Sequence, residues 1–560
     1  MLYVDLSKNK IKAVNLNYKS YIGGKGVATK LLFNIPQKID PLSPENAIIF
    51  GIGPINGVNL PGASRMTCVF KSPMTNGYGE SQCGGHIAKE FKKAGVDFLY
   101  ITGKAKKPSY LFIENNNVEI RDASHIWGKD TFETEEILKE DCKGEVLCIG
   151  QAGENLVRFA SINHRKGRQF GRAGAGAVMG SKNLKAVVVK GYRKVEVANP
   201  EELKEFRKWL IKAAKEKLQS LTKYGTPGIM DLVNEVGVLP TKYWTKGYFK
   251  DVEHINATAL SKYVKKHTTC YGCTVACGII SKTEDAEVEG PEYETLFALG
   301  SLCENTSLKS IIKAAELCDR YGIDTISTGN VIAFSMACSE RGDIKNEIKF
   351  GDGDITIELI KKIAFRHGIG NVLAEGVKRA AEILKVSIEP IHCKGLELPG
   401  YDPRGLFGIA LGYAVSPRGA CHMRSCAYRP NLVGAVDRTS PKGQAALVKE
   451  LEDMYCIVDS FVLCRFLCLP IIGPISWEEL SKLYWIVTNE KVTVEELKKI
   501  GENICNLTRE FNLREGIKED LLPSKFLKAA LEAGKSAGMF VDEKNFKEML
   551  NEYYSLRGWN

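Results

Sequence analysis

The sequence predicts an α+β protein with a β-rich first third and mainly helical segments after it. Apolar residues recur at helical spacing from Pro200 onward, first over residues 200–221 and later over 358–384. A change of pattern near residue 196 and a glycine-rich stretch after residue 391 predict domains at 1–196, 197–391 and 392–560. Strand-length apolar runs bounded by glycine or polar residues stand in the first third at 47–53, 98–103, 110–114, 146–150 and 186–191.

Composition and charge describe an ordinary globular chain. Of its 560 residues, 44% are hydrophobic and 26% are charged, which excludes a disordered chain, a collagen and a coiled coil. No apolar run approaches the roughly eighteen residues of a membrane span, and the first residues lack the apolar core of a signal peptide. We therefore expect a cytoplasmic protein. The net charge of +10 is spread along the chain, which favours a lysine-rich solvated surface and no nucleic-acid partner.

The cysteines carry more information. Seventeen of them, an odd number, stand in a chain without an export signal, so we expect reduced and mostly buried thiols. In CYGCTVAC, Cys270, Cys273 and Cys277 have the spacing of iron–sulfur ligands, which usually number four. A zinc site is the competing interpretation. Candidates for a fourth thiolate are Cys464, Cys468, Cys303, Cys318 and Cys421.

Two acidic hexapeptides share one pattern. DRYGID (319–324) and DSFVLC (459–464) both read D-x-x-x-aliphatic-(D or C), and each follows a helical pattern. A carboxylate can accept paired N–H bonds from a heterocycle that carries an amino group. The two segments therefore predict two similar heterocycles or one pseudo-symmetric ligand. The alternative is two ordinary helix ends with solvated aspartates.

Together with other segments, these motifs resemble the aldehyde:ferredoxin oxidoreductase family, whose members use tungsten or occasionally molybdenum. The resemblance covers nearly the whole chain, and it depends on the number and order of the segments. They are DPLSPEN (40–46), IRDASHIWGKDTFETE (120–135), GQAGENLVRFASI (150–162), GAVMGSKNLKAV (176–187), CYGCTVACG (270–278), EGPEYETLFALG (289–300), DRYGIDTISTG (319–329), LELPGYDPRG (396–405), PRGACH (417–422) and DSFVLC (459–464).

The resemblance implies a fold and two metal cofactors. An N-terminal domain of two sheets would be the base for a tungsten or molybdenum bis-pterin cofactor, and two mainly helical domains would close over it. The implied ligands of a 4Fe–4S cluster are Cys270, Cys273, Cys277 and Cys464. The implied pterin-binding residues are Asp319, Ile323 and Asp324 in one loop, and Asp459, Leu463 and Cys464 in the other.

The resemblance also implies a site for the pterin phosphates. Arg65 matches a residue at these phosphates, with Gly84 and Gly85 beside it. The backbone carbonyls of Gln82 and Gln169 match those that hold a bridging Mg²⁺, an ion that prefers oxygen ligands. Arg168 and Arg172 are further phosphate partners, since arginine suits bidentate phosphate contacts.

The implied activity is the oxidation of aldehydes to carboxylic acids. Electrons would pass through the 4Fe–4S cluster to ferredoxin or to a small iron–sulfur subunit. Glu294 matches the catalytic carboxylate and His422 a histidine near the metal, while Glu292 is the neighbouring carboxylate to weigh against Glu294. The alternative within the same family is the reduction of aromatic-ring thioesters in a multi-subunit complex.

Three positions depart from the family pattern. Val462 stands where glycine often precedes the leucine of the second acidic motif, which puts the pterin geometry there in question. Gln82 replaces a familiar asparagine, with little effect expected because only its carbonyl is needed. Lys313 and Glu316 stand where some members bridge a dimer through a metal, so we expect no such metal; a homodimer stays compatible with the resemblance.

Overall fold

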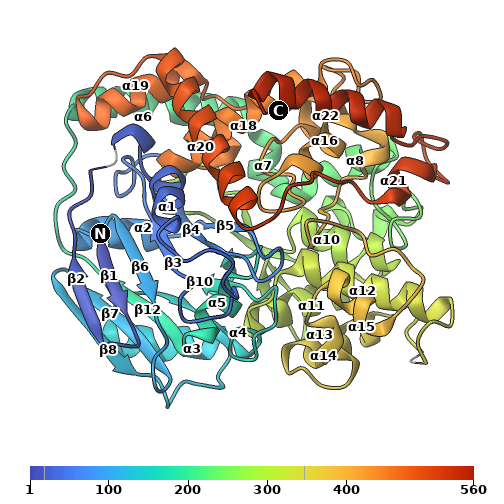
Figure 1. Cartoon of the computed structure of the whole chain (residues 1–560), viewed down its shortest axis with the longest axis horizontal. Coiled ribbons are helices and arrows are strands. Elements are labelled where there is room, and N and C mark those ends of the chain that lie inside the picture. Colours follow the sequence, from blue (N-terminus) through green and yellow to red (C-terminus); the bar gives the residue numbers. More distant parts are fainter. Residues whose placement is uncertain (18, 346, 560) are drawn as a thin grey trace.

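Two mixed β-sheets form most of the N-terminal third in the computed structural model, which describes residues 1–17, 19–345 and 347–559 (Figure 1). The first sheet contains, from edge to edge, β2 (Lys10–Ala13), β1 (Leu2–Asp5), β6 (Phe98–Thr102), β3 (Ile48–Gly51), β4 (Met66–Lys71) and β5 (Tyr78–Cys83). The second contains β8 (Asn117–Asp122), β7 (Ser109–Glu114), β12 (Leu184–Lys190), β9 (Glu145–Cys148), β10 (Ile162–His164) and β11 (Arg168–Phe170).

The two sheets repeat one topology. In each, a hairpin leads the unit, its first strand pairs in parallel with the last strand of the unit, and the other pairs are antiparallel. The strand orders are therefore equivalent, with β7–β12 repeating β1–β6. A shared core that includes Phe50 and Phe170, whose ring centroids lie 5.6 Å apart, joins the two units.

Helices connect and cover the strands of both units. They are α1 (Gly24–Leu32), α2 (Ile87–Ala94), α3 (Thr131–Cys142), α4 (Gln151–Glu154) and α5 (Ala175–Ser181). Helix α2 of the first unit packs on β9 and β12 of the second, while α5 of the second packs on β3, β4 and β5 of the first. This exchange joins the two sheets into one base.

Helices dominate the rest of the chain. Residues 200–384 form α6 (Pro200–Lys217), α7 (Gln219–Tyr224), α8 (Met230–Val236), α9 (Ala257–Ser261), α10 (Tyr293–Leu299), α11 (Leu308–Tyr321), α12 (Thr325–Glu340), α13 (Gly353–Ala364), α14 (Ile369–Leu373) and α15 (Val377–Leu384). A small sheet of β13 (Val264–Thr268), β14 (Gly278–Lys282) and β15 (Glu287–Glu289) lies among them.

The last third is also mainly helical. After the β16 (His392–Cys393) and β17 (Leu396–Glu397) pair come α16 (Phe407–Val415), α17 (Tyr428–Leu432), α18 (Gln444–Phe461), α19 (Trp477–Thr488), α20 (Val494–Arg514), α21 (Ser524–Lys528) and α22 (Glu543–Arg557). The central helix α18 packs on α1, α16, α20 and α22. The described helices include none that is long and apolar enough to cross a membrane.

The predicted α+β class, with a β-rich first third and mainly helical segments after it, is confirmed. The boundaries near 196 and 391 stay predictions. Helix α6 follows the first of these boundaries in sequence but packs against α19 of the last third, beside which it lies in Figure 1.

Candidate functional site

Four cysteines gather at one cavity between the N-terminal sheets and the helices. Cys270, Cys273, Cys277 and Cys464 line a cavity of about 50 Å³, although Cys464 is almost two hundred residues away in sequence. These four are partly exposed, whereas the other thirteen cysteines are buried, including Cys468 and the remaining candidates for a fourth ligand. The prediction of mostly buried thiols is therefore confirmed, and exposure separates the four from the rest.

The spacing of the four sulfurs argues against a single zinc ion. A tetrahedral zinc with bonds of about 2.3 Å would hold its sulfurs about 3.8 Å apart. Among the residues that the structure describes, the only group of three or more metal-binding side chains with ligand atoms within 4.8 Å of one another is Asp251, Glu253 and His254. No three of the four sulfurs are that close. Sulfurs spread more widely around a common cavity suit a larger iron–sulfur group.

Donors surround these sulfurs. The backbone N–H of Gly85 donates to Cys270 Sγ at 3.2 Å, and a Cβ on Gly84 would lie 2.9 Å from the same sulfur. Arg65 and Arg168 line the cavity as well. Burial, with Cys464 close by, raises the pKa of Cys273 to about 11. The free Cys273 thiol thus stays protonated near pH 7, and a bound cation would have to displace that proton.

The two acidic motifs occupy matching loops. The first acidic loop (319–324) closes α11, and the second acidic loop (459–464) closes α18. Asp324 then caps the N-terminus of α12, and Cys464 precedes the short 3₁₀ helix at 465–468. Both aspartates at the start of the loops, Asp319 and Asp459, are buried rather than solvated, so the interpretation as ordinary exposed helix ends is wrong.

The predicted magnesium carbonyls lie at equivalent places in the two sheets. Gln82 is on β5 and Gln169 on β11, the edge strands of their sheets, and these two edges are in contact. Gln82 pairs with Thr67 as Gln169 pairs with Asn163. The Gln82 carbonyl accepts a bond from Arg65 Nη2 at 3.2 Å. The sequence analysis missed this repeat, although the shared Gln-x-Gly of residues 82–84 and 169–171 signals it.

The predicted phosphate arginines differ in their surroundings. Arg168 lies 2.5 Å from Glu289 and beside the cysteine cavity. Arg172 is buried and donates to Asp324, to the Ala420 carbonyl at 2.9 Å and to the Glu397 carbonyl at 2.7 Å. These partners take up three of the five N–H donors of Arg172, including its Nε, so its geometry favours a positioning role for Asp324 over a phosphate contact.

Three buried arginines near the second acidic loop went unnoticed in the sequence. Arg418, Arg424 and Arg465 each carry a side-chain nitrogen without a hydrogen-bond partner among the described residues. Buried unpaired donors in native proteins usually have a partner that the coordinates do not hold. Together with the unpaired Gln82 Nε2, they fit an anionic group bound between the sheets and the helices. The sequence signal for Arg418 and Arg424 is the arginine-rich stretch 418–429, whereas Arg465 directly follows the second acidic motif.

Glu294 and His422 meet in a second, larger cavity of about 340 Å³. Glu294 stands in the first turn of α10, and its Oε2 accepts a bond from the Gly400 N–H at 2.9 Å. Its other oxygen, Oε1, faces His422 Nδ1 at 3.5 Å, and neither atom has a hydrogen-bond partner in the described part of the chain. The two side chains are 15% and 13% exposed, so a small molecule in the cavity can reach them.

Burial shifts both groups toward their neutral forms. It raises the pKa of Glu294 to about 8. Burial, with Arg172, Arg418 and Arg465 nearby, lowers the pKa of His422 well below its usual value. Near pH 7 Glu294 is therefore mainly protonated, and the imidazole of His422 is neutral. Perturbed groups in a cavity are typical of acid–base sites.

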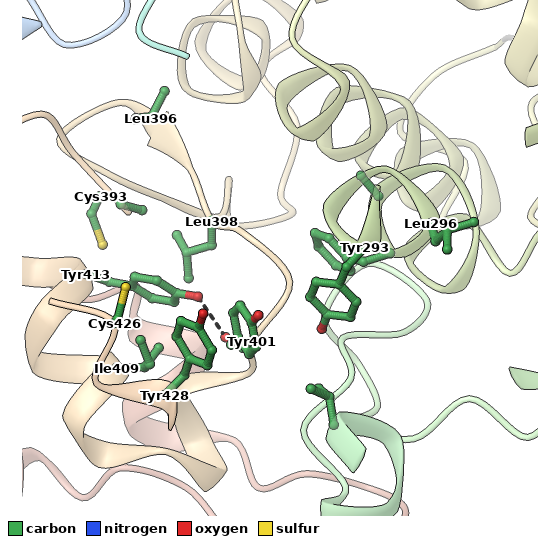
Figure 2. Close-up of a cluster of buried hydrophobic side chains, with 14 of the residues drawn as sticks. Tyr293, Leu296, Cys393, Leu396, Leu398, Tyr401, Ile409, Tyr413, Cys426 and Tyr428 are labelled. Carbon is green, nitrogen blue, oxygen red and sulfur yellow. Dashed lines mark hydrogen bonds between the residues drawn. The ribbon is translucent and has the colours of Figure 1, made fainter. Parts of the chain in front are cut away.

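Aromatic side chains that the sequence analysis did not single out form one wall of this cavity. Tyr401 stacks on Tyr428 with 4.2 Å between ring centroids, and Tyr293 approaches from α10 on the other side (Figure 2). The Tyr413 hydroxyl donates to the Tyr401 carbonyl at 3.1 Å and fixes this segment. Glu292 also lines the cavity, but its carboxylate accepts a bond from Thr226.

Comparison with known proteins finds one family over both the N-terminal part and the rest of the chain. A family model described as the N-terminal domain of aldehyde ferredoxin oxidoreductase matches residues 1–191, and one for domains 2 and 3 matches 201–560. The tungsten-containing aldehyde ferredoxin oxidoreductase of Pyrococcus horikoshii is 38% identical, covering 100% of this chain and 96% of the relative. An aliphatic sulfonate oxidoreductase, WOR-like subunit, of Pyrococcus furiosus is 32% identical, covering 100% and 94%.

A solved structure is similar in fold. It is described as the active site complex BamBC of benzoyl coenzyme A reductase with 1,5-dienoyl-CoA, and it superposes with a TM-score of 0.86 at 26% identity. The match covers 100% of this chain and 94% of that one.

Proposed function

Because the chain belongs to the aldehyde ferredoxin oxidoreductase family and is an oxidoreductase, we propose that it oxidises aldehydes to carboxylic acids with a tungsten bis-pterin cofactor. Electrons would leave through a 4Fe–4S cluster held by Cys270, Cys273, Cys277 and Cys464, and ferredoxin would accept them. The observation that carries the proposal is the pair of unpartnered atoms, Glu294 Oε1 and His422 Nδ1, which face each other inside one cavity.

The chain offers fitting residues for the cofactor. The buried Asp319 and Asp459 would accept N–H groups of the two pterins, and the unpaired donors of Arg418, Arg424 and Arg465 suit an anionic group. When bound, the tungsten centre would take up the two electrons that leave the aldehyde carbon. Side chains of the protein would transfer the proton, orient the oxygen and exclude bulk water.

The reaction consumes water and releases protons: an aldehyde and one water give a carboxylic acid, two protons and two electrons. An oxygen placed about 2.8 Å from both Glu294 Oε1 and His422 Nδ1 would complete a triangle with them. Glu294 as carboxylate would take a proton from the attacking water, and His422 would orient the oxygen. The stacked Tyr401 and Tyr428 would exclude bulk water from this side.

The pH dependence tests this role for Glu294. Because burial raises the pKa of Glu294 to about 8, its base form increases as pH rises through that value. We expect kcat to rise with pH, with a midpoint near 8, and Glu294→Gln to lower kcat by about 10²–10⁴ and to abolish this limb. Glu292→Gln is the matched control and should cost less than about tenfold. A larger loss of kcat in Glu292→Gln than in Glu294→Gln would assign the role of general base to Glu292.

The first experiment is metal analysis with absorption spectra of anaerobically purified protein, followed by an aldehyde screen with a viologen dye. Tungsten or molybdenum together with iron would support the proposal. Zinc alone would overturn it, and with it the roles of Glu294 and His422.

The fold likeness to the benzoyl coenzyme A reductase complex supports one alternative function, reduction of an aromatic thioester in a multi-subunit complex. Purification from the native source distinguishes this alternative from aldehyde oxidation. Further iron–sulfur or flavin subunits that remain bound, with no aldehyde turnover, would favour this alternative.

A further inference from the structure

Arg429 brings a positive charge without a counterion to the cavity that holds Glu294 and His422. The residue lies in the first turn of α17, is half-buried and lines the cavity. Its Nε is buried and has no hydrogen-bond acceptor among the residues that the structure describes. A buried polar group left unpaired destabilises the fold, so such an atom in a native protein indicates a missing partner.

The acidic groups of this cavity do not neutralise Arg429. Two carboxyl groups line it, Glu292 and Glu294. Glu292 accepts from Thr226, and Glu294 accepts from Gly400 while facing His422. Burial raises the pKa of both, to about 8 for Glu294, so much of the negative charge of Glu294 is absent near pH 7. The exposed Lys217 adds a second cation at the same cavity.

Most of the other side chains that line the cavity are apolar. Leu221, Ile229, Met423, Phe466 and Leu469 contribute to its walls, beside the tyrosines already described. The cavity thus combines a reacting end at Glu294 and His422, apolar walls, and a guanidinium elsewhere in the lining. A guanidinium offers a planar fork of donors that matches carboxylate, sulfonate and phosphate groups.

We propose that Arg429 is an anion subsite and that the substrate is an aldehyde whose distal end carries a carboxylate or a similar oxyanion. This inference rests on the proposed function for its reaction but not for its binding. It predicts a ligand with a short apolar chain between two polar ends.

The activity test compares pairs of aldehydes of equal length on the metal-loaded enzyme. Probes are pentanal against 5-oxopentanoate, with 4-oxobutanoate, 6-oxohexanoate and a sulfonated aldehyde to define length and head group. We expect kcat/KM to favour the anionic partner by about tenfold to a hundredfold, the scale of one charged hydrogen-bonded contact. Arg429→Met should abolish this ratio, and Arg429→Lys should keep part of it.

The chain contains a matched control. Arg207 on α6 is also half-buried with an unpaired Nε, but it does not line the cavity. Arg207→Met should leave the ratio unchanged. If pentanal and its anionic partner are used equally well, or if Arg429→Met leaves the preference intact, the inference is wrong while the proposed function stands.

A binding test separates failure of the anion subsite from failure of the proposed reaction. Calorimetry on the purified full chain compares glutarate, with two carboxylates, and pentanoate, with one. We expect glutarate to bind at least tenfold more tightly and Arg429→Met to remove the difference. If the enzyme oxidises no aldehyde but glutarate still binds through Arg429, the proposed reaction fails and the anion subsite remains. Equal binding of both acids would overturn the subsite.

Discussion

The two acidic loops share one backbone design but differ in charge. Helices α11 and α18 both end in a left-handed residue, Gly322 at φ 72° and Val462 at φ 55°. The next residues, Ile323 and Leu463, both donate to the carbonyl five positions back, at 2.9 and 3.0 Å. This bond closes the helix in a Schellman-type turn. The shared turn explains why the two sequence motifs have one pattern.

Each loop is anchored on an equivalent part of the N-terminal repeat. Asp324 donates its N–H to the Phe159 carbonyl at 3.2 Å, and Cys464 donates to the Gly62 carbonyl at 3.0 Å. Two residues after β3 and β9, Gly53 and Gly150 approach the carbonyls that end α18 and α11; a Cβ there would lie 2.1 and 2.5 Å from them. The sheet with β3 thus supports the second loop, and the sheet with β9 supports the first.

The charges around the two aspartates are opposite. Burial by itself would raise the pKa of Asp459, but Arg465, Arg424 and Lys25 outweigh it and lower the value to about 2. Burial raises the pKa of Asp319 well above its usual range, and Glu289 adds to the rise. The side-chain amide of Gln169 is the donor that reaches Asp319. One loop therefore holds a paired carboxylate, while burial in the other favours the neutral form of an aspartate that has no ion-pair partner among the described residues.

The largest effect should come from the sixth position, where the loops carry Cys464 and Asp324. Cys464→Ala removes a sulfur from the proposed cluster site, so iron content should fall and ferredoxin reduction should drop by about 100-fold or more. Iron analysis and electron paramagnetic resonance of the dithionite-reduced protein measure the loss of the cluster, and a ferredoxin reduction assay measures the loss of electron transfer. Cys468→Ala, at a buried thiol outside this cavity, is the control and should retain the iron. Full iron content in Cys464→Ala would remove this residue from the ligand set.

The aspartates at the first position should respond unequally to loss of charge. Asp459→Asn leaves Arg465 buried without its carboxylate, while Arg424 keeps only Glu80, and it should lower the free energy of unfolding by about 3–5 kcal/mol. Asp319→Asn replaces an acid whose neutral form burial favours and should cost less than about 1 kcal/mol. Urea denaturation of the cofactor-free variants measures both. Equal costs would mean that the two loops do not differ in charge.

Acid titration sharpens the same comparison. The folded pKa of Asp459 lies below its unfolded value of 3.8, so its contribution to stability is present above that value and is lost as pH falls toward about 2. We expect the wild-type urea midpoint to fall over this interval and Asp459→Asn to flatten that part of the curve. Asp319→Asn should leave it in place, and a curve that Asp459→Asn does not change would contradict the assigned ion pairs.

The sequence was sufficient for patterns that local chemistry determines. The D-x-x-x-aliphatic repeat follows from one turn geometry, and the CYGCTVAC spacing brings three sulfurs to one cavity. Contacts between residues far apart in the sequence could not be predicted from it. The duplicated strand order depends on which edges meet. Arg418 and Arg429 look alike in sequence, although Arg418 donates to the Glu80 carbonyl on β5 and Arg429 lines the Glu294 cavity. Which arginine lacks a partner depends on packing that no local pattern encodes.

A smaller effect is expected at the fourth position of the first acidic loop. Gly322→Ala puts a Cβ in a left-handed conformation, 3.1 Å from the Gly150 backbone nitrogen. The strain should lower the free energy of unfolding by about 1–3 kcal/mol. Urea denaturation measures it, with Gly342→Ala as the control: Gly342 is also left-handed, but no atom lies within 4 Å of its added Cβ. If both variants lose the same amount, close approach to the second sheet contributes nothing.

The smallest effect belongs to Val462, which occupies the same turn with a β-branched side chain. Val462 is fully buried, and its Cγ2 packs against Gly24. Val462→Gly loses about 2 kcal/mol of apolar burial but removes about 1–2 kcal/mol of left-handed strain, so the net cost should be near 1 kcal/mol. Val462→Ala loses burial and keeps the strain. We therefore expect urea denaturation to show the glycine variant at least as stable as the alanine variant, against the order at helical positions, where glycine is about 1 kcal/mol worse. The ordinary order would mean that the second acidic loop stores no strain at Val462, and that the departure from glycine there is free of conformational cost.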